Sequence, residues 1–487
     1  MLQLPGGVIT KVKLKEIFSA KDMTQGSPSA RIVEFAIPML IGNFAQQLYN
    51  TADTVIVGKF VGDNALSAVG SASPIMNLLI ALFVGIGAGA GIVVSQSFGA
   101  KDRTRLSRTI GNCLDIAIIS TIFIMILGPL VTMPLLRLLG TPASIIDWCA
   151  QYLKIIFIGS AGHFFYNMLS GILRGMGDSF TALGFLLIAA GLNVGLDLLF
   201  VSRMGVAGVA LATCLSQGIS AVLCLIKLMH MRDVFDLNRD AMKLRKENAG
   251  EVIRMGVPAG ITQAIMSVSM LVVQRLTNSL GETVIACNVI IMRVDGFAML
   301  PNQSFGQAIA TFTGQNVGAH KFDRVKKGLR QGLIISLAFS ITMVGLMLIF
   351  GHYLFGIFTT TEMLIDLAIS MMRVMALGYI CVTVSQVLGG VMRGAGDTIT
   401  PMVVSIFTTV CLRVPSAYII AHLTRSPEYP NGAPICLFLS HLIAWSLGMV
   451  VYIVLYKVGR WKKAMARSAA RSQVSGGEAD ADPLSSF

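Results

Sequence analysis

Long runs of apolar residues recur along the chain and are separated by short polar segments. A helix needs about 20 mainly apolar residues to cross the ~30 Å hydrocarbon core of a bilayer. The runs are continuous and do not alternate with period two, which excludes a transmembrane β-barrel. We therefore predict an all-α polytopic membrane protein with twelve transmembrane helices, at residues 32–57, 66–95, 107–136, 145–172, 180–202, 206–229, 252–277, 283–314, 328–351, 364–392, 399–422 and 434–457.

A short phrase occurs twice in the chain. Arg174–Thr181 reads RGMGDSFT, and Arg393–Thr400, 219 positions later, reads RGAGDTIT. A second phrase recurs at the same offset: Gln96, Gly99, Ala100 and Arg105 return as Gln315, Gly318, Ala319 and Arg324. Two matches at one spacing indicate that the whole first half is repeated. Each half holds six predicted helices, so we predict two pseudo-symmetric six-helix bundles. Secondary transporters place their substrates at the interface between such repeats.

The repeat and the polar segments together set the expected domain boundaries. We predict a cytoplasmic N-terminal segment at 1–30, an N-lobe at 31–230 and a C-lobe at 251–463. A charged cytoplasmic linker at 231–250 joins the lobes. Residues 464–487 are rich in Ser, Ala, Gly and Asp, and we expect a disordered cytoplasmic tail there.

Composition agrees with a membrane protein, because 54% of the residues are hydrophobic, 13% are charged and the mean hydropathy is +0.73. The net charge of +13 reflects the orientation of the chain in the membrane. Of the 38 Lys and Arg residues, 29 lie in or beside the N-terminus, the even-numbered loops and the C-terminus, and 5 accompany the odd-numbered loops. This asymmetry predicts that both termini are cytoplasmic in a cell membrane. The basic surface is expected to contact membrane lipids rather than nucleic acid, and we expect no cleavable signal peptide.

The first predicted helix carries a polar stripe. Gln46, Tyr49, Asn50 and Asp53 follow one another at i, i+3, i+4 and i+7, which places them on one helix face. Charged groups at bilayer depth are costly, and a polar stripe in a membrane has to face protein or water. The stripe therefore predicts a polar site inside the N-lobe.

Other polar residues of the first half reach a similar depth. At 1.5 Å per residue, Asp53 and Asp197 each lie about 8 Å below the outer ends of their helices. Asn193, one turn from Asp197, is about 14 Å down, and Thr213 and Tyr152 lie at similar depths. Two neighbouring carboxylates cannot both stay charged away from water, so such a site takes up H⁺ or binds Na⁺. The alternative is a purely structural hydrogen-bond network.

In the second half, Asp295 lies nearest the middle of a predicted helix, and Arg293 is two residues away. Met299, on the same helix, is a candidate for an adaptable apolar cavity. The eight cysteines are scattered singly without metal-binding spacing, so we expect them to act as small apolar packing residues, with no cofactor.

The duplicated Arg-Gly-x-Gly-Asp turns, the Gln-x-x-Gly-Ala phrases and Asp53 with the Asn193/Asp197 pair resemble the multidrug and toxic compound extrusion (MATE) family, from about residue 30 to 460. The resemblance implies two six-helix lobes around a central cavity, and export of amphipathic, often cationic, drugs in exchange for H⁺ or Na⁺ by alternating access. It implies a cation site at Asp53, Asn193, Asp197 and Thr213, and cavity positions at Gln46, Tyr152 and Asn167. Asn167 is too deep to join the cluster easily. We expect a monomer.

One branch of the family carries acidic residues in its seventh and tenth helices, where this chain has Gln263 and Gln386. The departure favours the branch that couples through the N-lobe, with Asp295 serving the C-lobe cavity. Three alternatives remain. A lipid-linked oligosaccharide flippase is kept open by Arg293 and Arg373. An intramembrane enzyme lacks a supporting motif in the predicted helices, and a channel would need no buried acidic site in one lobe.

Overall fold

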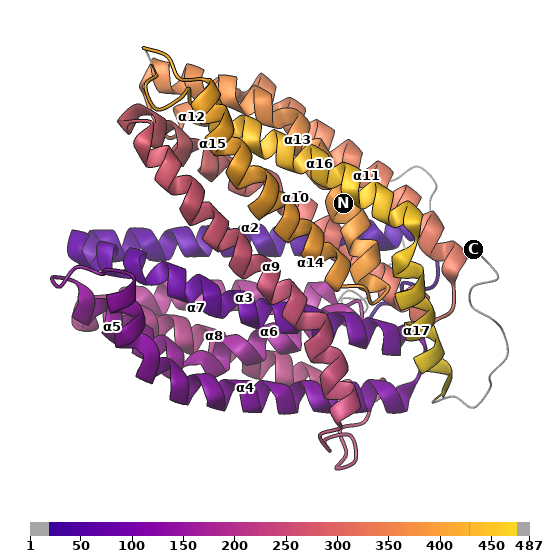
Figure 1. Ribbon diagram of the computed structural model, residues 1–487. Coiled ribbons are helices and arrows are strands. Elements are labelled where there is room, and N and C mark those ends of the chain that lie inside the picture. Colours follow the sequence, from indigo (N-terminus) through magenta and orange to yellow (C-terminus); the bar gives the residue numbers. More distant parts are fainter. Residues whose placement is uncertain (1–18, 428, 475–487) are drawn as a thin grey trace, which may run out of the picture.

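The computed structural model describes residues 19–427 and 429–474, and within them the chain is all helical (Figure 1). Residues 1–18 of the expected N-terminal segment 1–30, and residues 475–487 of the expected tail, lie outside the described residues. The first half comprises α2 (Pro28–Phe60), α3 (Asp63–Gly99), α4 (Arg103–Leu138), α5 (Ile146–Ile158), α6 (Ser160–Gly175), α7 (Ser179–Met204) and α8 (Val206–Met229). The second comprises α9 (Lys246–Ser279), α10 (Glu282–Gly318), α11 (Phe322–Ile349), α12 (Gly351–Gly356), α13 (Glu362–Gly394), α14 (Ile399–Ile406), the π-helix η1 (Phe407–Arg413), α15 (Val414–Leu423), α16 (Ile435–Val458) and α17 (Arg460–Val474).

These helices form two bundles, an N-lobe of α2–α8 and a C-lobe of α9–α16 (Figure 1). Two of the twelve predicted spans are broken. The fourth bends by 49° between α5 and α6, at Gly159, and the eleventh consists of α14, η1 and α15 in continuous succession. Among the described residues, ten helices and the α5–α6 pair are long and apolar enough to cross a membrane. The remaining span is α2, the first along the chain. Its 33 residues are long enough to cross a membrane, but its Asn and Gln side chains lower its hydropathy.

The duplication is visible in the backbone. Gly62 and Gly281, which share the offset of 219, both have φ near +100°. The corresponding residues Lys101 and His320 have φ of 56° and 55°, and they are the two described non-glycine residues with positive φ. A left-handed conformation is unfavourable for a side chain with a Cβ. The same unfavourable turn at matching places shows that the halves share their loop geometry as well as their helices.

Each repeated Arg-Gly-x-Gly-Asp phrase ends one helix and begins the next. The Asp178 carboxylate accepts a hydrogen bond from the Thr181 backbone N–H at 3.0 Å and from the Thr181 hydroxyl at 2.6 Å. Asp397 accepts the equivalent bond from the Thr400 backbone N–H at 3.0 Å. These aspartates therefore cap the first turns of α7 and α14, as N-cap residues do.

Replacing Asp178 with Ala is expected to lower stability by about 1–2 kcal/mol, because it removes a cap whose donors are buried. Thermal unfolding of the purified protein in detergent measures the change. Asp323→Ala is the control, since this carboxylate is well exposed beside Lys326 at the start of α11. An Asp178→Ala variant as stable as the control would contradict the assignment of a capping role.

The two halves meet through a crossed pair of hydrogen bonds. The Gln96 amide donates to the carbonyl of Gly394 at 2.9 Å, and the Gln315 amide donates to the carbonyl of Gly175 at 3.1 Å. Each glutamine thus binds the last residue of the helix that ends in the other half's Arg-Gly phrase. We call the region around Gln96, Gly175, Gln315 and Gly394 the junction. In Figure 1 the lobes converge towards α17 and diverge towards α5, α12 and α15.

Glycines let the helices of the two lobes touch at backbone distance. A Cβ on Gly99 would lie 1.9 Å from the Gln315 carbonyl oxygen, and one on Gly318 would lie 1.9 Å from that of Gln96. Further along α3, a Cβ on Gly85 would meet the backbone of Gly260 in α9 at 2.4 Å. Small residues allow this close packing between membrane helices.

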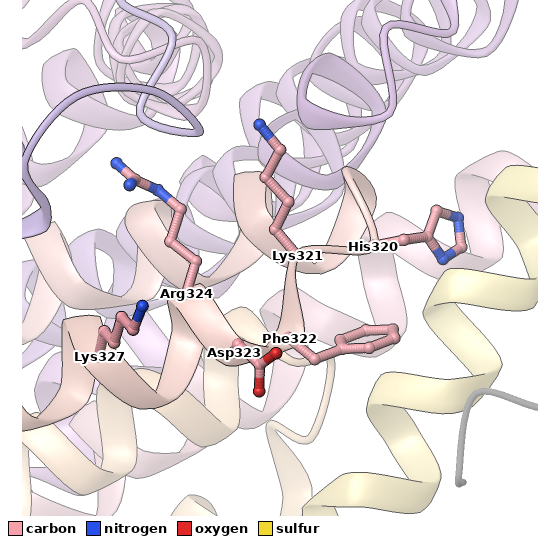
Figure 2. Close-up of a pocket in the computed structure, with 6 residues that line it drawn as sticks. All are labelled: His320, Lys321, Phe322, Asp323, Arg324 and Lys327. Atoms are coloured by element: carbon pink, nitrogen blue, oxygen red, sulfur yellow. The ribbon is translucent and has the colours of Figure 1, made fainter. Parts of the chain in front are cut away.

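The segment before α2 crosses the junction. Met23 donates its backbone N–H to the Gln315 side chain of the second half at 2.8 Å, and Lys21 donates its backbone N–H to the Met176 carbonyl of the first half at 3.1 Å. Arg324 donates to the Met23 carbonyl at 3.1 Å, and Lys321 donates to the Thr24 carbonyl at 2.9 Å. Figure 2 shows both cationic side chains projecting from the turn that begins α11. Residues 21–24 therefore connect the two lobes.

The expected disordered tail is wrong for residues 464–474, because they continue α17 to Val474. Trp461, Met465 and Ala469 are buried, and the Ser468 hydroxyl donates to the Ala395 carbonyl at 3.4 Å. These apolar side chains recur at helical spacing, whereas the overall composition of the tail is polar. A composition argument alone therefore missed an amphipathic helix that packs against the junction.

Candidate cation site in the N-lobe

Three helices bring the four predicted cation residues together. Asp53 lies on α2, Asn193 and Asp197 lie one turn apart on α7, and Thr213 lies on α8. Asn193 and Asp197 are fully buried and Thr213 is 5% exposed, whereas Asp53 is half-buried. The site is therefore enclosed on the α7–α8 side and reachable on the α2 side.

The Asn193 amide connects the two carboxylates. Oriented with its nitrogen towards them, it donates to Asp53 Oδ1 at 2.6 Å and to Asp197 Oδ2 at 3.1 Å. This orientation is assigned from the hydrogen-bond partners, since the opposite one would face an oxygen towards two acidic groups. Thr213 Oγ1 lies 3.4 Å from the other atom of the same amide. Asn193 thus sits at the centre of the cluster.

Two tyrosines complete the surroundings. The Tyr49 hydroxyl lies within hydrogen-bonding reach of Asp53 and Thr213. Tyr152, on α5, is buried and lies close enough to both carboxylates to interact with them electrostatically. Asp53 and Asp197 are also within hydrogen-bonding reach of each other. Asp197 Oδ1 is buried and has no hydrogen-bond partner among the described residues. A buried acceptor in this state is costly unless a proton, a cation or water occupies the site.

The other predicted cavity residues lie elsewhere. Gln46 and Asn50 are on the same helix as Asp53, but their side chains are exposed. Asn167 lies beyond the bend, on α6, where its amide donates to the His163 carbonyl of its own helix at 2.8 Å. Asp295 and Met299 are on α10 in the other lobe, and Met299 packs against the C-lobe core. The structure therefore gathers the predicted cation residues with Tyr49 and Tyr152, and not the remaining cavity candidates.

A second polar group, which the sequence pattern did not single out as a cluster, lies in the C-lobe. The Thr383 hydroxyl donates to Asn302 Oδ1 at 2.8 Å. Their counterparts 219 positions earlier, Phe83 and Phe164, form an aromatic pair with ring centroids 4.6 Å apart. Aligning the two halves of the sequence would have revealed this pair, because two aromatic residues in one half are replaced by two polar residues in the other.

Comparison with known proteins decides the family. The MatE family model matches residues 38–199 and 258–419, once in each half. The chain belongs to the MatE family. It is 30% identical over 447 residues to the probable multidrug resistance protein YpnP of Bacillus subtilis, covering 91% of this chain and 98% of that protein. It is 25% identical to the multidrug export protein MepA of Staphylococcus aureus, over 75% of this chain and 81% of MepA.

The solved structures support the same fold. An outward-facing MATE family multidrug resistance transporter superposes with a TM-score of 0.84 at 24% identity, covering 91% of this chain and 98% of the other. The two pseudo-symmetric six-helix halves predicted from the repeat are therefore confirmed. As a MatE protein, the chain is a multi-span membrane transporter of the multidrug efflux type.

Proposed function

We propose that this protein is a secondary antiporter that exports amphipathic organic cations in exchange for H⁺, which binds between Asp53 and Asp197. The contact of Asn193 with both carboxylates carries the proposal. Desolvation and mutual repulsion oppose two neighbouring buried charges, and one shared proton removes both problems. We take H⁺ rather than Na⁺ as the coupling ion because two neighbouring carboxyl groups can share one proton without any further ligand.

The coupling follows from what the proton changes. In the unprotonated state the cluster is negative and attracts an organic cation through Asp53, its half-buried member. A proton shared by the two carboxyl groups halves the negative charge and so weakens this attraction, and the drug is released. Coupling of this kind is reciprocal, so a bound drug lowers the affinity for the proton by the same factor.

The charge distribution and the packing of the lobes support one orientation of the protein in the membrane. Basic residues gather at the junction end, where Lys21, Arg103, Lys321 and Arg324 lie, and the positive-inside rule places that end in the cytoplasm. With the lobes joined there, the conformation described is outward-open. Exchange of one proton for one monovalent organic cation moves no net charge, so the pH gradient drives it, and each pH unit supplies about 1.4 kcal/mol, enough for roughly tenfold accumulation.

Dye efflux from vesicles tests the proposal. Protein reconstituted into sealed liposomes is expected to move a fluorescent cationic dye when a pH gradient is imposed, and not when a sodium gradient of equal size is imposed. Transport with sodium alone would replace H⁺ by Na⁺ at the same site. Transport with neither gradient would remove antiport as the function.

A further inference from the structure

The two repeated Arg-Gly-x-Gly-Asp turns are covered by segments that lie before α2 and after α16. In the first turn, the Met176 carbonyl accepts a hydrogen bond from the Lys21 backbone N–H at 3.1 Å. In the second, the carbonyl of Ala395, 219 positions later, accepts one from the Ser468 hydroxyl of α17 at 3.4 Å. The same carbonyl is therefore bound in both halves, each time by a segment outside the repeat.

Glycine at the next position makes room for each covering segment. Gly177 and Gly396 have φ of 85° and 93°. A Cβ on Gly177 would overlap the Lys21 carbonyl oxygen, whereas one on Gly396 would lie 2.6 Å from the Ser468 hydroxyl. A backbone carbonyl cannot rotate away as a hydroxyl can. The first turn therefore requires glycine more strictly than the second.

Residues 19–25 contact both lobes, and we call them the strap. At the N-lobe end, the Lys21 backbone binds Met176, and the Lys21 ammonium lies 5.2 Å from the ring centroid of Phe180 on α7. The ammonium is also 3.7 Å from the Glu34 carboxylate of α2, and the lysine side chain is 22% exposed. Cation–π contacts and ion pairs of partly exposed groups are weak. This end of the strap is therefore held by few and weak contacts.

The C-lobe end of the strap is held more firmly. Met23 is 1% exposed. Arg324 donates to the carbonyls of Met23 and Gln25 at 3.1 and 3.0 Å, and Lys321 donates to the carbonyl of Thr24 at 2.9 Å. In Figure 2 the side chains of Lys321 and Arg324 extend to the same side of the turn that begins α11. Hydrogen bonds from charged donors are the stronger ones, so three successive strap carbonyls are bound tightly to this lobe.

The counterparts of these two cations in the first half have other roles. Asp102 stands at the position of Lys321 and caps α4 by accepting from the Arg105 backbone N–H at 2.9 Å. Arg105 stands at the position of Arg324, and its guanidinium pairs with Glu251 of α9 at 3.3 Å. The lysine that binds the strap therefore belongs to the second half only, and is not a general feature of the repeat.

We propose that the strap is a latch of the junction. It releases its Lys21 end from the turn between α6 and α7 when the lobes separate there, and it stays bound to the C-lobe through residues 23–25. The latch rests on the proposed function, because alternating access opens the junction in one of its two states. A segment bound to both lobes has to leave one of them, and the end with fewer and weaker contacts leaves first. The strength of that end then sets the fraction of molecules that are open at the junction.

The first test weakens the N-lobe end and needs no transport. Gly177→Ala displaces the Lys21 carbonyl, and Gly396→Ala is the control, because it places an equally strained alanine in the equivalent turn. The native cysteines are removed and Ser95→Cys supplies the target, since Ser95 is fully buried at the junction against Gly314 of α10. Maleimide is expected to label it at least about fivefold faster with Gly177→Ala than with Gly396→Ala. Equal labelling in the two backgrounds would overturn the latch.

The second test asks which end of the strap releases. A bis-methanethiosulfonate reagent, which dithiothreitol removes, links Lys21→Cys to Phe180→Cys in one variant and Thr24→Cys to Lys321→Cys in another. The native side chains of each pair are in contact. The first link joins the strap to the N-lobe and the second joins it to the C-lobe. Both variants are reconstituted into vesicles, and each is compared with itself before linking.

The measurement is exchange of labelled for unlabelled cationic dye across the vesicle membrane, which requires both openings but no ion gradient. Exchange is expected to fall at least about tenfold with the first link, to recover after reduction, and to stay within about twofold with the second link. No loss with the first link, or a loss with the second, would overturn the latch. Exchange without gradient-driven export would count against antiport and not against the latch. If the unlinked variants exchange no dye, the export proposal fails and the labelling result alone decides on the latch.

Discussion

Replacing Asp53 with Asn is expected to reduce gradient-driven dye export to the level of protein-free vesicles, a loss of about a hundredfold. The amide keeps the volume and can still contact Asn193, but it neither takes up a proton nor carries a negative charge. The site would then resemble its protonated state permanently, so drug binding would weaken and the proton gradient would have nothing to act on. The coupling of two ligands is typically 5–150-fold, and this variant removes it entirely.

The matched control is Asp115→Asn, which removes a half-buried carboxylate from α4, outside the cluster. Export is measured at equal amounts of reconstituted protein, with thermal unfolding to show that both variants fold. If Asp53→Asn exported dye at the rate of the unmodified protein, the carboxyl pair could not be the coupling site.

Replacing Gly99 with Ala is expected to open the junction. The new Cβ would lie 1.9 Å from the Gln315 carbonyl oxygen, and backbone on both sides leaves no flexible side chain to move away. Overpacking of this kind costs about 1–3 kcal/mol, which changes the ratio of closed to open molecules by roughly 5- to 150-fold. Gly318→Ala should act in the same way, because the equivalent contact is made by Gln96.

Maleimide labelling measures the shift. The native cysteines are removed, and a single cysteine is introduced by Thr24→Cys as the only target. Thr24 is a buried position of the segment that crosses the junction. Labelling should be faster in the Gly99→Ala background than with glycine. Gly345→Ala is the control, since a Cβ at Gly345 meets nothing within 4 Å. Equal labelling in the two alanine backgrounds would show that the glycine contact does not hold the lobes together.

Much of the fold could be predicted because the constraint of the bilayer is simple. Among the described residues, eleven of the twelve spans are long and apolar enough to be recognised, and the repeat at one offset requires matching halves. The details that escaped prediction depend on contacts between distant residues. No local sequence pattern indicates that Gln96 and Gln315 each bind the opposite half. The bend at Gly159 and the π-helix before Val414 likewise involve contacts with neighbouring helices.

The candidate site divides in the same way. Helical spacing and depth were enough to place Asp53, Asn193 and Asp197 together, because both are set by regular helix geometry. Depth also kept Asn167 out of the cluster, and this residue lies on α6, beyond the bend, with its amide donating to its own helix. Helical spacing could not pair Asn302 with Thr383 in the C-lobe, because the two residues lie on separate helices. The roles of Asp53, Asn193 and Asp197 in transport stay predictions until the variants are measured.

The crossed hydrogen bonds of Gln96 and Gln315 also bear on how such a molecule arises. Each glutamine amide donates to a carbonyl of the opposite half, so each half supplies the acceptor for the other half's glutamine. Two identical copies of one half could satisfy the same reciprocal requirement across a twofold axis. The geometry is therefore that of a symmetric dimer of two half-length chains. Fusion of two such copies through a linker such as residues 231–250 would keep the pairs together, and each copy could then change its sequence independently.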